Sequence, residues 1–103
     1  MPDPMKIRAN LVGDSTEVKV LMSHEMDTGL AKDSSGKVIP AWFIQKVTVL
    51  HNDQQVLYAQ WGTAVSKNPF MSFKFKGGAK GDKVTITWVD NHNETRTDSA
   101  VVG

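Results

Sequence analysis

Residues 71–76 (MSFKFK) and residues 84–88 (VTITW) alternate strictly between apolar and polar side chains. A period of two places the apolar side chains on one face of an extended chain, so both segments predict half-buried β-strands. The same alternation occurs in residues 6–11, 17–22 and 55–61. No window of eleven or more residues shows a convincing helical period of 3.6 residues. The sequence therefore predicts a chain made of strands.

Turn-forming residues separate these segments at fairly even spacing, at residues 13–15, 52–53, 77–82 and 91–93. About seven strands in 103 residues predict an all-β fold, an immunoglobulin-like antiparallel β-sandwich. A chain of this length has room for one hydrophobic core, so residues 1–103 are expected to form a single immunoglobulin-like domain. The polar stretch 27–37 is predicted to be a long connection between the two sheets.

The most apolar run, residues 39–51, changes register partway along. Trp42 and Ile44 share one register, whereas the valines from Val47 onward share the other. Such a slip predicts a β-bulge near residues 45–46.

The alternation also predicts which large side chains form the core. Those expected inside are Ile7, Val20, Phe73, Val84, Ile86 and Trp88. Four other aromatic residues fall where the alternation breaks: Trp42, Phe43, Trp61 and Phe70. Trp42 and Phe43 are consecutive and would point to opposite faces of a regular strand, so one ring must leave the core unless the bulge redirects it. These four rings are the candidate partner-binding residues, although a covering loop could equally bury them.

Composition excludes several classes of function. The chain has no cysteine, which removes disulfides, thiolate nucleophiles and thiolate metal sites. Twelve Lys and Arg against eleven Asp and Glu give a net charge of +1, which indicates neither nucleic-acid nor membrane binding. No apolar segment approaches the roughly 20 residues of a membrane helix, and no signal peptide is visible.

Three histidines, His24, His51 and His92, are the best candidates for catalytic or metal chemistry. They are expected at a strand end and in two hairpins, where one end of the sandwich could bring two of them together with Asp27 or Asp53. No pair has the short spacing that places two ligands on one element. The preferred interpretation is surface and turn histidines, with no catalytic residue, metal or cofactor.

Four lysines, Lys74, Lys76, Lys80 and Lys83, lie close together in the sequence. They are interpreted as a solvated strand face that discourages edge-to-edge aggregation. An electropositive docking patch is the alternative.

Two segments resemble the SoxZ family of bacterial sulfur oxidation. The first comprises residues 23–33 (SHEMDTGLAKD) with residues 36–44 (GKVIPAWFI). The second is residues 62–70 (GTAVSKNPF), followed by Gly81-Asp82 opening a strand that ends at Asp90. Two positions depart from the pattern: Glu25 replaces a common proline and Asn93 a common glycine.

The resemblance implies a non-catalytic, immunoglobulin-like subunit that pairs tightly with a SoxY-type protein. In that family the SoxY partner carries the sulfur intermediates on a cysteine near its C-terminus, and other sulfur-oxidation enzymes dock transiently. It also implies a periplasmic location by co-export with the partner. The loop residues His24, Met26, Asp27 and Asn68 are the candidate docking loop. A free-standing peptide- or protein-binding module and a small metal-dependent redox enzyme remain the alternatives.

Overall fold

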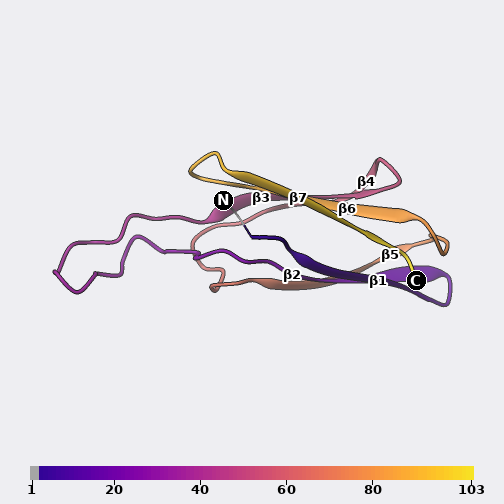
Figure 1. Cartoon of the computed structure of the whole chain (residues 1–103), viewed down its shortest axis with the longest axis horizontal. Coiled ribbons are helices and arrows are strands. Elements are labelled where there is room, and N and C mark those ends of the chain that lie inside the picture. The colour runs from indigo at the N-terminus through magenta and orange to yellow at the C-terminus, as the bar shows by residue number, and fades with distance from the viewer. Residues whose placement is uncertain (1–2) are drawn as a thin grey trace.

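The computed structural model describes residues 3–103 and contains two antiparallel sheets packed face to face (Figure 1). The first sheet has the order β1 (Lys6–Val12), β2 (Ser15–Leu21), β5 (Phe70–Lys76). The second has the order β4 (Gln54–Gln60), β3 (Ile44–His51), β6 (Lys83–Asp90), β7 (Thr95–Val101). The predicted immunoglobulin-like β-sandwich of seven strands is confirmed, and the described residues contain no helix that could cross a membrane.

Short turns close the hairpins at residues that tolerate a left-handed backbone. Gly13 has a φ of 65° between β1 and β2, and Asn52 and Asp53 have φ values of 48° and 71° between β3 and β4. Two consecutive residues with positive φ form the type I′ turn that matches the twist of a β-hairpin. Asn93, with a φ of 62°, turns β6 into β7. Glycine or asparagine is favoured at such positions, which explains the turn signals in the sequence.

The core forms where the inward faces of the two sheets meet. Val18 and Val20 of β2 pack against the inward residues of β3 and β6, and all are fully buried or nearly so. Of the six predicted core residues, Val20, Val84, Ile86 and Trp88 are buried. Ile7 and Phe73 are only half-buried, although both pack against the core. They lie on β1 and β5, the outer strands of the three-stranded sheet, and each of these strands pairs within that sheet with one neighbour, β2.

The predicted bulge is present in β3, but the apolar run 39–51 forms a strand only from Ile44 onward. The pairing of β3 with β6 shifts between Ile44 and Lys46, as the slip in the sequence indicated. Residues 39–43 do not extend the strand, and Trp42 makes only an isolated bridge to Asp27. These residues lie beyond the end of the sheet, where Pro40 has no N–H with which to continue a ladder.

The connection between β2 and β3 forms a projecting arm, which we define as residues 27–42. It joins the two sheets, as predicted, and its two legs run antiparallel through bridges at Asp27–Trp42 and Lys32–Val38. The Asp33 carboxylate holds the tip by accepting hydrogen bonds from the Ser35 hydroxyl (2.7 Å) and the Lys37 N–H (3.1 Å). The arm reaches far beyond the sandwich and gives the molecule extents of 52 × 21 × 20 Å (Figure 1).

One side of the sandwich is closed by contacts between β1 and β7. The Met5 N–H donates to Asp98 Oδ2 (2.9 Å), and the Gly103 N–H donates to the Ala9 carbonyl (2.9 Å). Arg96 holds the Asp98 carboxylate in place through two hydrogen bonds of 2.8 Å. These bonds from Arg96 are the main reason why the pKa of Asp98 lies below its ordinary value, despite partial burial, which acts in the opposite direction.

Candidate functional site

Asp90 organises the end of the sandwich from which the arm projects. It is the last residue of β6 and is fully buried. Its Oδ2 accepts hydrogen bonds from Trp42 Nε1 (2.8 Å) and His24 Nε2 (3.0 Å). Its Oδ1 accepts from the backbone N–H groups of His92 and Glu94, both at 2.9 Å. Burial alone would raise the pKa of Asp90, but the hydrogen bonds outweigh it, so the pKa lies below the ordinary value.

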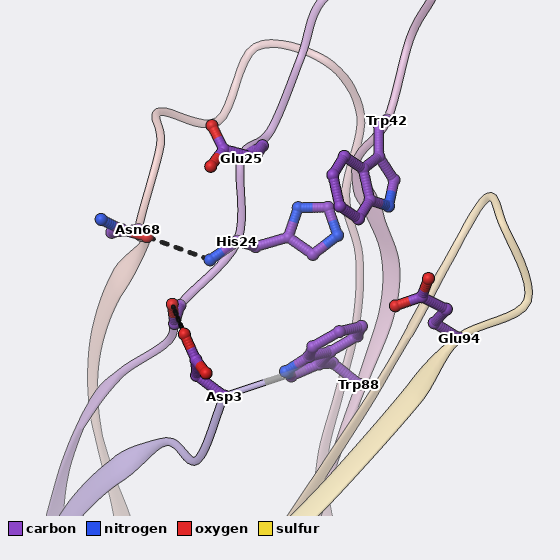
Figure 2. A pocket seen from close by; sticks show the side chains of 8 residues that line it. Asp3, His24, Glu25, Trp42, Asn68, Trp88 and Glu94 are labelled. Carbon is purple, nitrogen blue, oxygen red and sulfur yellow. Dashed lines mark hydrogen bonds between the residues drawn. The ribbon is translucent and has the colours of Figure 1, made fainter. Parts of the chain in front are cut away.

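His24 is held in one tautomer by its neighbours. The Met26 N–H donates to His24 Nδ1 (3.0 Å), so this nitrogen is the acceptor and Nε2 carries the hydrogen that is donated to Asp90. The imidazole lies edge-on to the indoles of Trp42 and Trp88, with both centroid distances 5.1 Å (Figure 2). Both ring nitrogens are therefore occupied within the protein, and neither is free to bind a metal.

Trp42 links the arm to the sandwich. Its indole is half-buried and stacks on the exposed His92 ring at 5.1 Å with an interplanar angle of 3°. His24 contacts the same indole at an angle of 62°. Two backbone hydrogen bonds, 2.7 Å and 3.0 Å long, join Trp42 to Asp27 at the base of the arm. We call His24, Trp42, Asp90 and His92 the histidine–tryptophan cluster.

The predicted docking-loop residues differ in burial. His24 and Met26 are buried, with 6% and 4% of their surface exposed, and shape the loop from inside. Met26 has a φ of 50°, and its sulfur accepts the Ile44 N–H at 3.3 Å. Asn68 is exposed, but its Oδ1 accepts the His24 N–H (3.0 Å), so the segment before β5 is tied to this loop. Asp27 is half-buried at the base of the arm.

A cavity of about 180 Å³ lies beside the cluster (Figure 2). Trp88 lines it, and Asp3, Glu25 and Glu94 contribute carboxylates. The Trp88 Nε1–H is buried and has no hydrogen-bond acceptor among the described residues. Glu25 forms an exposed ion pair with Lys67 at 3.2 Å.

The four candidate interface aromatics differ in exposure. Trp42, Phe43 and Trp61 are half-buried, and Phe43 and Trp61 pack against the core. Phe70 is 62% exposed at the start of β5, directly opposite Leu21 of β2, which is 40% exposed. Of these four residues, Phe70 therefore has the largest exposed fraction that a partner could bury.

The expectation of surface histidines is wrong for His24. It was expected to be exposed at a strand end, but the Asp90 carboxylate and two indoles enclose it. The structure does bring two histidines together, with Trp42 between His24 and His92. The carboxylate that binds the His24 imidazole is Asp90, and not Asp27 or Asp53, whereas His92 bonds to Asp90 through its backbone N–H.

The third histidine, His51, lies at the opposite end of β3, as expected for a hairpin residue. Its Nε2 is 2.8 Å from Asp82 Oδ2, and this hydrogen bond is the largest cause of the lowered pKa of Asp82. Across residues 3–103, no group of three His, Asp or Glu side chains is arranged to hold a metal ion.

The fold and this cluster define a small immunoglobulin-like β-sandwich whose buried carboxylate, Asp90, is hydrogen-bonded within the chain. Residues 5–101, nearly the whole chain, match the family model described as Sulphur oxidation protein SoxZ. The chain belongs to this family, and the resemblance seen in its sequence is confirmed. A comparison with curated proteins found no match.

Proposed function

We propose that this chain is the non-catalytic subunit of a sulfur carrier, and that it forms a heterodimer with a SoxY-type protein whose cysteine carries the sulfur intermediates. The observation that carries the proposal is the SoxZ family match over residues 5–101. The absence of cysteine supports it, because these 103 residues offer no thiol on which a sulfur intermediate could form.

The surface of the protein supports a binding role. An exposed aromatic ring, Phe70, lies beside an exposed aliphatic side chain, Leu21, and aromatic residues are enriched at protein interfaces. The hydrogen bonds of the histidine–tryptophan cluster support a structural role for Asp90 and His24. Asp90 accepts four hydrogen bonds and both nitrogens of His24 are used, so neither group is free to act as a base.

The proposal extends to the place of action. We propose that the heterodimer works in the periplasm, and that this chain is exported together with the partner. Fractionation of the native host tests this, since deleting the partner's export signal should leave this chain in the cytoplasm. Export that continues without the partner's signal would contradict the co-export route.

Co-purification tests the heterodimer directly. The tagged chain is co-expressed with the SoxY-type protein encoded in the same genome and purified under non-reducing and reducing conditions. We expect a complex of one copy of each chain under both conditions, because this chain cannot contribute a disulfide. A free-standing binding module would not retain the SoxY-type protein, and that result would contradict the proposal.

A further inference from the structure

The outer face of the β1–β2–β5 sheet concentrates positive charge. Its outward side chains include five cations, at Lys6, Arg8, Lys19, Lys74 and Lys76. Glu17 is the one carboxylate that this face contributes, and it lies 3.8 Å from Lys19 and 3.9 Å from Lys74. The whole chain has a net charge of only +1, so the excess is local to this face.

The register of the sheet places two of these cations in an unfavourable position. Arg8 lies directly opposite Lys19 across the β1–β2 pair, and like charges in this position destabilise a sheet. Among residues 3–103, neither Lys6 nor Arg8 has a carboxylate within 4.0 Å. An anion supplied from outside the chain would relieve this repulsion.

An apolar pair lies at the same end of the face. Leu21 pairs with Lys6 on one side and with Phe70 on the other, so the three side chains form a row across the sheet. With Ile7, Arg8 and Lys19 they line a shallow groove of about 430 Å³, which we call the basic groove. Its surface is an apolar centre with a cationic border, the arrangement expected of a protein interface.

The β6–β7 half of the opposite sheet lacks these features. On its outer face, Thr85 bonds to Ser99 (3.1 Å) and Thr87 to Thr97 (2.9 Å) across the β6–β7 pair. These hydroxyl groups already have partners within the sheet, and no like-charged pair faces outward between β6 and β7. A partner would gain less there than at the basic groove.

The size of the face indicates how far a stable interface must extend. Three strands of seven residues offer a projected area on the order of 300 Å², whereas a standard interface covers roughly 800 Å² on each partner. A second depression continues from Leu21 and Lys6 to Ser23 and Asn68, which also line the cavity beside the histidine–tryptophan cluster. The groove and the docking loop are thus parts of one continuous surface.

We propose that the basic groove is where the partner subunit docks. The partner places an apolar side chain against Leu21 and Phe70, and its carboxylates face Lys6, Arg8 and Lys19. This inference rests on the proposed function, and it adds the surface used and the chemistry required of the partner: an acidic rim around an apolar anchor.

Isothermal titration of the full chain with the SoxY-type protein tests the apolar anchor. Phe70→Ala should weaken binding by about tenfold or more, as truncation of a central aromatic does. The matched control is Tyr58→Ala, which removes an aromatic ring 46% exposed on β4 of the opposite sheet, and it should change the affinity by less than about twofold. Circular dichroism establishes that both variants remain folded.

Charge reversal tests the cationic border. The double variant Lys6→Glu, Lys19→Glu should weaken binding by about tenfold or more at low salt, because carboxylates would then face carboxylates. The double variant Lys46→Glu, Lys83→Glu makes the same change of charge on the other sheet and should have little effect. The difference in affinity between the two double variants should narrow as NaCl rises from about 50 mM to 500 mM, because the Debye length falls from roughly 14 Å to 4 Å.

The outcomes separate the two proposals. If the unmodified chain does not bind the SoxY-type protein, the proposed function fails and the groove assignment fails with it. If it binds but the groove variants behave like their controls, the function stands and the groove assignment is overturned. The assignment is also overturned if the charge reversal abolishes binding to anionic phospholipid vesicles or duplex DNA and spares the partner. Dimerisation of the chain alone, abolished by Phe70→Ala, would assign the groove to a second copy instead.

Discussion

Asp90 connects three segments of the chain. Its carboxylate accepts hydrogen bonds from His24 just after β2, from Trp42 at the base of the arm and from the turn that follows β6. A buried carboxylate is tolerated only when its oxygens are satisfied, and here four donors do so. The donors in turn depend on Asp90, because the His24 Nε2–H is buried too.

Replacing Asp90 by alanine should therefore destabilise the fold strongly. The change removes the acceptor of four donors at once, and leaving buried donors unsatisfied costs about 1–3 kcal/mol each, with partial recovery by water. We expect a loss of about 3 kcal/mol or more in the free energy of unfolding, measured by urea denaturation. Asp14→Ala, which removes an exposed carboxylate in the β1–β2 turn, should change it by less than about 0.5 kcal/mol. A loss below about 1 kcal/mol for Asp90→Ala would contradict this role.

Asp98 should contribute to the pH dependence of stability. Its pKa is lower in the folded chain than its ordinary value, so the ionised carboxylate favours the folded state. This contribution is complete above the unfolded pKa of about 4 and is lost as the pH falls through the folded pKa. The free energy of unfolding should thus fall less steeply below about pH 4 in Asp98→Asn than in the unmodified chain. Asp53→Asn, in the β3–β4 hairpin, is the control; equal slopes for Asp98→Asn and the unmodified chain would refute the assignment.

The residue-level features show where sequence reasoning reaches its limit. The exposed aromatic was within the predicted set, because breaks in the alternation mark rings that need not face the core. The burial of His24 could not be predicted, since it depends on Asp90, 66 positions away, and on two indoles from different segments. The one available signal was that an acidic residue, Asp90, continues the inward series of β6 after Trp88.

At the scale of elements, β6 contributes the largest buried side chain of the core, Trp88. Its inward residues Val84, Ile86 and Trp88 are all nearly or fully buried, and the strand lies between β3 and β7 in its sheet. Period-two alternation therefore located this strand and its face correctly from the sequence. The start of β3 cannot be located from the apolar run alone, because apolar residues continue past the point where the sheet ends and only the pairing partners define that point.

Truncating Trp88 tests how much the buried face of β6 contributes to the free energy of unfolding. Trp88→Ala should lower the free energy of unfolding by about 3–5 kcal/mol, the usual cost of removing a large buried ring. Phe70→Ala removes a ring that is 62% exposed and should cost less than about 1 kcal/mol. Chemical denaturation of the two variants provides the comparison. Equal losses would show that the register assigned to β5 or β6 is wrong.

The outer part of the arm, residues 30–39, should be dispensable for folding. The Lys32–Val38 bridge joins only its own legs, and residues 30–38 are exposed, whereas Trp42 at the base of the arm contacts the sandwich and is retained. Replacing residues 30–39 by an Asn-Gly turn should keep the β circular dichroism spectrum and change the free energy of unfolding by no more than about 1 kcal/mol. A same-length Gly-Ser replacement is the control for loop length. Failure of the shortened chain to fold would show that the arm stabilises the sandwich.

The molecule as a whole is longer than a compact chain of its length. Its radius of gyration is 15.4 Å, whereas a compact domain of about 100 residues has roughly 13 Å. The arm accounts for the excess, since it extends the long axis to 52 Å beside short axes of 21 and 20 Å. Small-angle X-ray scattering can measure how far the radius of gyration falls when residues 30–39 of the arm are replaced by the short turn.

The proposed division of labour within the carrier also makes a prediction for the whole molecule. When the heterodimer is loaded with thiosulfate-derived sulfur, intact-mass spectrometry should find the added mass on the SoxY-type chain alone. This chain should keep its unmodified mass, because it has no thiol. A reductant-sensitive adduct on this chain would contradict the proposed function outright.

The one-sided placement of Lys6, Arg8, Lys19, Lys74 and Lys76 has a kinetic consequence. Charge gathered on one face gives a nearly neutral protein a permanent electric moment, so an approaching acidic surface exerts a torque on it before the two surfaces touch. Encounters are then oriented in advance, and the association rate constant rises at low ionic strength by about one to three orders of magnitude, largely independently of how long the complex lasts.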